Sequence, residues 1–229
     1  MYTQLSSASA SSTLAASRNK VMRNTYWLLA LSLLPTVVGA LIGVQMNFGF
    51  MRASPIVSSL LMLAVLYGMM FAIEKNRYSS LGVGLMLGFT FLMGLLLGPL
   101  LQAALALRNG GQLIALAAGG TSAAFFALAA IASTTKRDLS FLSKFITVGV
   151  VVLMVAVVAN IFLQLPALQL ALSVGFILLS SAIILYQIKE VVDGGEDSYI
   201  SATLTLYVSL YNIFSSLLQL LMAFGGDRD

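Results

Sequence analysis

The chain contains neither cysteine nor histidine, and charged residues make up only 9% of it. Without cysteine it has no disulfide, no thiolate nucleophile and no thiolate metal ligand; without histidine it lacks the usual base of near-neutral pKa. A rhomboid-type serine protease needs a histidine partner, a metalloprotease needs an HExxH helix, and an aspartyl protease needs two carboxylates within the membrane. The chain has none of these, nor a P-loop or a dinucleotide fingerprint. We therefore expect a protein that is not an enzyme and holds no cofactor or catalytic metal.

The chain consists mainly of long apolar runs. Apolar residues make up 59% of it, and the mean hydropathy is +0.98, outside the range of soluble globular domains. A bilayer core about 30 Å thick needs roughly 20 apolar residues in helical form, and all charged residues lie between uncharged stretches of about that length. The seven stretches are 26–47, 55–73, 81–107, 111–134, 145–164, 166–188 and 200–224. The tripeptide 164–166, Gln-Leu-Pro, separates the fifth from the sixth and predicts a tight turn there.

Positive charge is divided unequally between alternate gaps. The N-terminal segment and the gaps after the second, fourth and sixth stretches hold nine Lys and Arg residues, whereas the other side holds only Arg52, Arg108 and Arg228. By the positive-inside rule, the N-terminus is predicted to be cytoplasmic and the C-terminus periplasmic. The net charge of +4 then belongs to cytoplasmic membrane flanks and does not indicate nucleic-acid binding.

The expected fold is an all-α membrane protein, a bundle of seven transmembrane helices, because no strand-like alternation indicates a membrane barrel. Residues 1–17 are uncharged and rich in Ser and Ala, too polar to form a core. We divide the chain into a flexible cytoplasmic N-terminal tail, 1–23, and a transmembrane domain, 24–229. A cleaved secretory signal is not expected, since the first apolar run is of spanning length and begins well inside the chain.

Glycines spaced four residues apart predict close helix packing, because small residues let helix backbones approach in lipid. The pairs are Gly39 with Gly43, Gly84 with Gly88, and Gly94 with Gly98. Packing within the bundle is the favoured use of these pairs, and a dimerisation seam is the alternative. Pro99 is expected to bend or interrupt the third span.

A polar stripe runs along the last span. Its members recur at helical spacing and, at about 100° per residue, fall within an arc of about 80°: Thr205, Ser209, Asn212, Ser216 and Gln219. Lipid cannot satisfy amide side chains, so the stripe should face protein or a water-filled cavity, with this helix at or near the bundle centre. Interhelical hydrogen bonding and a lined route or ligand site both remain open interpretations.

Other polar side chains lie near span ends. Asn160 and Gln164 lie near the outer end of the fifth span and Gln187 near the inner end of the sixth, where interfacial solvation is an alternative to a functional role. The acidic residues Glu190, Asp193, Glu196 and Asp197 surround Gly194-Gly195. Carboxylate oxygens favour hard cations, but this spacing does not match an EF-hand loop, so a solvated loop is favoured over a calcium site.

Several segments, in the same order, resemble the Bax inhibitor-1 (transmembrane Bax-inhibitor-motif) family. They are 94–101 (GLLLGPLL), 119–126 (GGTSAAFF), 135–142 (TKRDLSFL), 160–168 (NIFLQLPAL) and, in the last span, 206–214 (LYVSLYNIF). Together with 23–26 (RNTY) and the 194–196 loop (GGE), they look closest to bacterial inner-membrane members. The resemblance implies seven transmembrane helices with the last enclosed by the other six.

The resemblance implies one of two functions. The bacterial members in question are substrates and modulators of the membrane-anchored ATP-dependent protease FtsH, which implies a non-enzymatic, multi-pass inner-membrane regulator with FtsH as partner. Other family members are calcium leak pathways in which two aspartates share a proton and control opening. Their positions correspond here to Gln187 and Ser209. Neither can ionise near neutral pH, so an ion or calcium leak, the alternative function, would lack the acid switch, while a hydrogen bond between the two could still join their helices.

Overall fold

The computed structural model describes residues 2–49, 53–136 and 139–226, with side chains from residue 17 onward. The helices are α1 (Tyr2–Gln45), α3 (Pro55–Lys75), α4 (Ser80–Leu96), α5 (Gly98–Leu105), α6 (Gly110–Thr134), α7 (Ser140–Leu163), α8 (Pro166–Asp193) and α9 (Tyr199–Gly225). Counting α4 and α5 together, seven helical stretches in these described ranges are long and apolar enough to cross a membrane. The predicted all-α bundle of seven spans is confirmed.

Two breaks between helices occur where proline predicted them. α8 begins at Pro166, directly after Gln164 takes up a left-handed conformation (φ 51°) that ends α7. The third span divides into α4 and α5 at Leu97, with Pro99 in the first turn of α5. Proline lacks the N–H that an uninterrupted helix would use, but the first turn of a new helix does not need that N–H.

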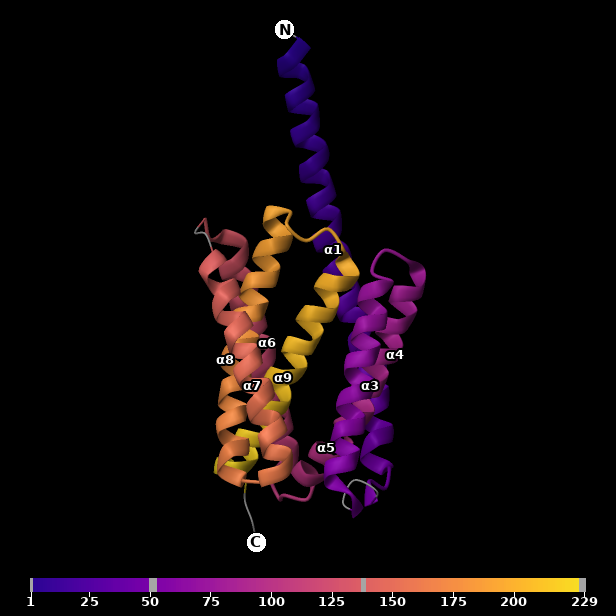
Figure 1. The fold of residues 1–229 in the computed structure, drawn as a ribbon, viewed down its shortest axis with the longest axis vertical. Coiled ribbons are helices and arrows are strands. Elements are labelled where there is room, and N and C mark those ends of the chain that lie inside the picture. Colours follow the sequence, from indigo (N-terminus) through magenta and orange to yellow (C-terminus); the bar gives the residue numbers. More distant parts are fainter. Residues whose placement is uncertain (1, 50–52, 137–138, 227–229) are drawn as a thin grey trace.

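The last helix lies inside the bundle. Figure 1 shows α9 running obliquely through the middle, from beside α3 and α4 at one end to beside α8 at the other, and it packs against α1, α3, α4, α5, α6 and α8. Within the described residues α7 contacts α8 and α3 but not α9, and none of its side chains is buried. The enclosure implied by the family resemblance is therefore complete except on the side of α7.

Two of the three predicted glycine pairs hold α1 against α4 and α5. A Cβ added to Gly43 would lie 2.5 Å from the carbonyl oxygen of Leu95, and one added to Gly98 would lie 2.5 Å from the carbonyl oxygen of Gly43. Gly84 and Gly88, by contrast, are exposed and have open space around them. Small residues therefore allow backbone-to-backbone contact at the pair on α1 and at the pair Gly94 with Gly98, whereas Gly84 and Gly88 make no such contact within the chain.

The largest buried side chains lie where α9 meets its neighbours. Tyr207 of α9 packs edge to face on Phe89 of α4, with ring centroids 6.2 Å apart. Ile184 and Ile188 of α8 are almost fully buried in the same cluster. Ordinary apolar packing around the last helix thus occupies most of the bundle interior.

The two ends of the bundle differ in charge. The described charged residues all lie at the end where α1 enters, apart from Arg108, and α9 ends at the opposite end (Figure 1). Arg52, Arg137 and Arg228 lie outside the described residues. The backbone of α1 is helical from Tyr2, so much of the segment predicted as a flexible tail projects beyond the bundle as a helix. Flexibility of this segment stays a prediction.

Candidate functional site: the polar face of the last helix

The start of α9 is anchored by a charged side chain from α3. Ser198 caps the helix by accepting a hydrogen bond from the backbone N–H of Ser201 (3.2 Å), and its own hydroxyl donates to the carbonyl oxygen of Arg77 (2.8 Å). The Ser201 hydroxyl lies 2.7 and 2.9 Å from the two carboxylate oxygens of Glu74, which also pairs with Arg77 at 3.0 Å. A carboxylate beside a helix N-terminus is stabilising. Sequence analysis missed this anchor, although a serine directly before the apolar run of α9 is the usual N-cap signal.

No member of the predicted polar stripe is exposed. Ser209 and Ser216 are buried, and Thr205, Asn212 and Gln219 are half-buried. The Ser209 hydroxyl donates to the carbonyl oxygen of Thr205 (2.8 Å), one turn earlier in its own helix. In this half of α9, local back-bonding therefore satisfies the hydroxyl without a partner on another helix.

At the far end of the stripe, amide side chains from three helices form a chain. Asn160 Nδ2 on α7 donates to Gln169 Oε1 on α8 (3.0 Å), and Gln169 Nε2 donates to Gln219 Oε1 on α9 (2.8 Å). The hydroxyl of Ser173 also donates to Gln219 Oε1 (3.2 Å). Sequence analysis singled out Asn160 and Gln219 but missed Gln169, which lies one turn into α8 and belongs to no stripe of its own.

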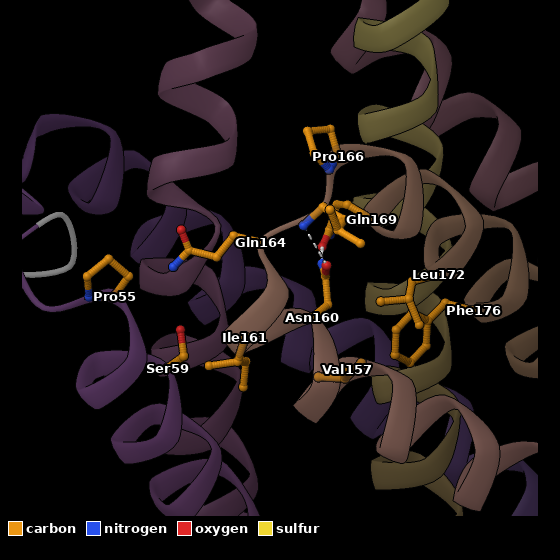
Figure 2. A pocket seen from close by; sticks show the side chains of 11 residues that line it. Pro55, Ser59, Val157, Asn160, Ile161, Gln164, Pro166, Gln169, Leu172 and Phe176 are labelled. Atoms are coloured by element: carbon orange, nitrogen blue, oxygen red, sulfur yellow. Dashed lines mark hydrogen bonds between the residues drawn. The ribbon is translucent and has the colours of Figure 1, made fainter.

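Asn160 and Gln169 border a cavity of about 570 Å³ between α3, α7 and α8, shown in Figure 2. Its walls are mostly apolar, with Pro55 and Ser59 from α3 facing Asn160 and Gln164 across it. No residue lining it carries a formal charge. Neutral amides exchange hydrogen bonds with water or an uncharged polar group, but they provide no proton-transfer group near neutral pH.

The two positions that correspond to the family aspartates do not bond to each other. Gln187 is half-buried on α8, and the proton of the Ser209 hydroxyl is directed to Thr205. The structure contains no hydrogen bond between these two described side chains, so in this conformation the possible link between their helices is not made. The Ser209 hydroxyl instead donates its proton to a carbonyl oxygen of its own helix.

A second polar cluster, which sequence analysis missed, lies where α1, α4 and α9 meet. Thr36 Oγ1 lies 2.7 Å from the Tyr207 hydroxyl, and both oxygens lie within 3.3 Å of the carbonyl oxygen of Thr90. The Ser32 hydroxyl, one turn away on α1, is buried with no hydrogen-bond partner among the described residues. These residues are far apart in sequence and each belongs to an otherwise apolar run, so only helix packing brings them together.

The acidic loop after α8 binds to side chains and backbone of the chain itself. Asp193 pairs with Lys189 (2.9 Å), and Asp197 accepts a hydrogen bond from the Tyr78 hydroxyl (2.8 Å), which raises the pKa of Tyr78. Glu196 accepts a hydrogen bond from the backbone N–H of Ser198 (2.9 Å). Across the part of the chain that the structure describes, no three acidic side chains gather in a way that could hold a metal ion.

Comparison with known proteins gives consistent matches. The family model described as "Inhibitor of apoptosis-promoting Bax1" matches residues 18–226. A protein of Neisseria meningitidis serogroup A is 49% identical over 213 residues, which cover 92% of this chain and 94% of the relative. The "Modulator of FtsH protease YccA" of Escherichia coli K12 is 44% identical over 205 residues, 90% of each chain. The same protein in a second Escherichia coli strain is described as an inner membrane protein. With seven spans of its own, this chain is therefore a multi-pass inner-membrane protein.

Proposed function

Because the chain belongs to the Bax inhibitor-1 family, we propose that it is a non-enzymatic membrane regulator that binds the FtsH protease and is slowly degraded by it. One observation carries the proposal: 44% identity to an FtsH modulator over 90% of both chains. The family match, over residues 18–226, includes all seven spans. The amide and hydroxyl groups along α9 support a role other than catalysis, since they offer neither an activated nucleophile nor a general base.

The charged end of the bundle fits contact with a cytoplasmic enzyme. Positive-inside statistics orient this end, with the N-terminus, towards the cytoplasm. There the first turns of α1 project beyond the other helices (Figure 1). Most helical stability in proteins comes from tertiary packing, and this projecting part of α1 lies beyond the helices it could pack against, so it provides a stretch that an ATP-dependent protease can unfold and grip.

Capture from membranes tests binding. The tagged full-length protein, purified from cells with proteolytically inactive FtsH, is expected to bring FtsH with it, because degradation no longer removes the complex. An unrelated seven-span protein with the same tag is the control. Recovery of equal FtsH with both proteins, or of none with this one, contradicts the proposed binding.

Truncation tests how the protein is degraded. Deleting residues 2–16 should lengthen the half-life in cells with active FtsH and leave it unchanged in cells without the protease. Replacing the same residues by an equally long Gly/Ser-rich segment is the matched control, because a flexible segment restores an entry point without restoring the sequence. Unchanged turnover after deletion would rule out this segment as the entry site, although FtsH binding itself would still be open to the capture test.

Reporter fusions test the orientation on which the contact depends. A reporter active only in the cytoplasm should function when fused at the N-terminus and fail when fused after Asp229, since seven spans place the ends on opposite sides. Activity at the C-terminal fusion would show that the orientation is the reverse of the predicted one. The projecting end of α1 would then be out of reach of a cytoplasmic protease.

An ion leak, the family's other activity, has one supporting observation. The polar face of α9 ends at Gln219, which is hydrogen-bonded to Gln169 in the wall of the cavity, so polar side chains extend into the bundle from the far end. No formally charged residue lines that cavity, which gives no basis for selecting calcium over other cations. We therefore rank this function second.

A further inference from the structure

A long apolar groove separates α1 from α6 on the side of the bundle away from α7. Within the described residues the backbones of these two helices do not approach each other closely, and α9 lies between them. Their one ring contact among these residues is at the Tyr26 end of the groove, where Tyr26 of α1 meets Phe125 of α6 edge to face with ring centroids 6.3 Å apart. Two adjoining cavities, of about 570 and 400 Å³, share Leu33, Ser122 and Leu210 in their walls. Each is within the roughly 300–1,000 Å³ typical of small-molecule sites.

The groove follows one face of α1 over most of the membrane. Its wall runs from Tyr26 through Leu33 to Ala40, about 21 Å at 1.5 Å per residue, or about two thirds of a bilayer core roughly 30 Å thick. Phe126 on the opposite wall is 69% exposed and Leu33 is 47% exposed. Both walls therefore open towards acyl chains, and the groove is longer than the half-thickness that one lipid chain covers.

Two described basic residues stand at the mouth of the groove at the end where α1 enters the bundle. Arg23 lies one turn before Tyr26 on α1, and Lys136 follows Ser133 just past the end of α6. Both side chains are exposed, and the described contacts include no ion pair or hydrogen bond for either. Lys189, by contrast, is paired with Asp193. The groove thus combines apolar walls within the bilayer core with two unpaired cationic side chains at the depth of the lipid headgroups.

We propose that this groove is a binding site for an anionic phospholipid. One acyl chain lies between α1 and α6 against Leu210 of α9, and the phosphate is held by Arg23 and Lys136. The apolar walls alone would accept a chain from any lipid, so the two cations provide the preference for negative charge. This site does not depend on FtsH binding, and its failure would leave the proposed function intact.

Lipid exchange on the purified full-length protein tests the headgroup contact. Native mass spectrometry in a detergent containing equal phosphatidylglycerol and phosphatidylcholine should show the anionic lipid retained preferentially. Each basic residue near the headgroups contributes about 1 kcal/mol, or about fivefold. The double variant Arg23→Gln/Lys136→Gln should therefore reduce the preference by about 25-fold. Lys75→Gln/Lys144→Gln, which removes the same charge from α3 and α7 at the same end, should leave most of it.

Filling the groove tests the acyl-chain contact. Ala130 lines the groove and is exposed, so Ala130→Trp adds bulk without disturbing the core, whereas Ala127→Trp adds the same bulk on an exposed part of α6 outside the groove. We expect loss of the retained lipid in the first variant only, with both variants keeping the wild-type thermal transition. Equal retention in both, or an equal effect of the two charge variants, overturns the proposal. Crosslinking from position 130 to a protein rather than to lipid in native membranes would also overturn it.

Discussion

Substituting a single glycine on α4 gives the sharpest test of how the bundle is held together. A Cβ on Gly94 would contact the carbonyl oxygen of Thr36 and lie 2.9 Å from its Cα and carbonyl carbon, where ordinary contacts are 3.4 Å or more. Because backbone atoms cannot rotate away as a side chain does, α1 and α4 must separate. A gap of about 0.5–1 Å already forfeits a quarter to a half of each dispersion contact.

The magnitude follows from two opposing terms. Overpacking costs about 1–3 kcal/mol, and contact with backbone places Gly94→Ala near the upper end. Alanine in place of glycine in a helix recovers about 1 kcal/mol, so the net loss in the free energy of unfolding is about 2 kcal/mol. Gly88→Ala on the same helix has open space around it and should be neutral or stabilising by up to about 1 kcal/mol.

Thermal unfolding of the purified protein in one detergent distinguishes these two variants. For a chain of this size 1 kcal/mol corresponds to about 2–4 °C, so Gly94→Ala should unfold roughly 5–10 °C below Gly88→Ala. Equal transition temperatures would refute the argument that backbone contact between α1 and α4 requires glycine.

Three further predictions concern polar groups inside the bundle. A double-mutant cycle of Gln169→Leu and Gln219→Leu should give a coupling energy of about 0.6 kcal/mol, the usual size of a hydrogen bond between transmembrane helices. Thermal or denaturant unfolding measures this coupling energy, and a value of zero would show that the amide chain does not join α8 to α9. Tyr207→Phe should lower stability by about 1 kcal/mol, because it removes the hydroxyl from the cluster shared by α1, α4 and α9 while preserving the ring packing; unchanged stability would contradict the role of that cluster. Any calcium flux in liposomes should vary little between about pH 6 and pH 8, because Gln187 and Ser209 occupy the positions of the family's two aspartates and neither side chain ionises in that range. A steep proton dependence abolished by changing either residue would contradict this.

The polar stripe shows what sequence periodicity can and cannot predict about the last helix. Helical spacing was enough to predict that Thr205 to Gln219 share one face and avoid lipid, since amides in lipid have no partner. Spacing does not specify which hydroxyl bonds back to its own helix and which side chain crosses to another. Gln169 became part of the amide chain only because α8 brings it between Asn160 and Gln219.

The glycine pairs likewise show that spacing in the sequence does not determine which residues meet another helix. All three have the spacing that permits close approach, yet only Gly39 with Gly43 and Gly94 with Gly98 meet another backbone. Nothing in the local sequence distinguishes them from Gly84 with Gly88, because the distinction depends on which face of α4 turns towards α1.

Hydrophobic length and helix-breaking residues act locally, and they were therefore sufficient to predict the number of spans, their approximate limits and the all-α class. The family was predicted from the resemblance of several short segments. Which helices touch is a different matter. The anchoring of α9 by Glu74, the cluster around Tyr207 and the groove between α1 and α6 each join segments distant in sequence. Such contacts depend on the relative rotation and tilt of whole helices, which are determined by tertiary packing.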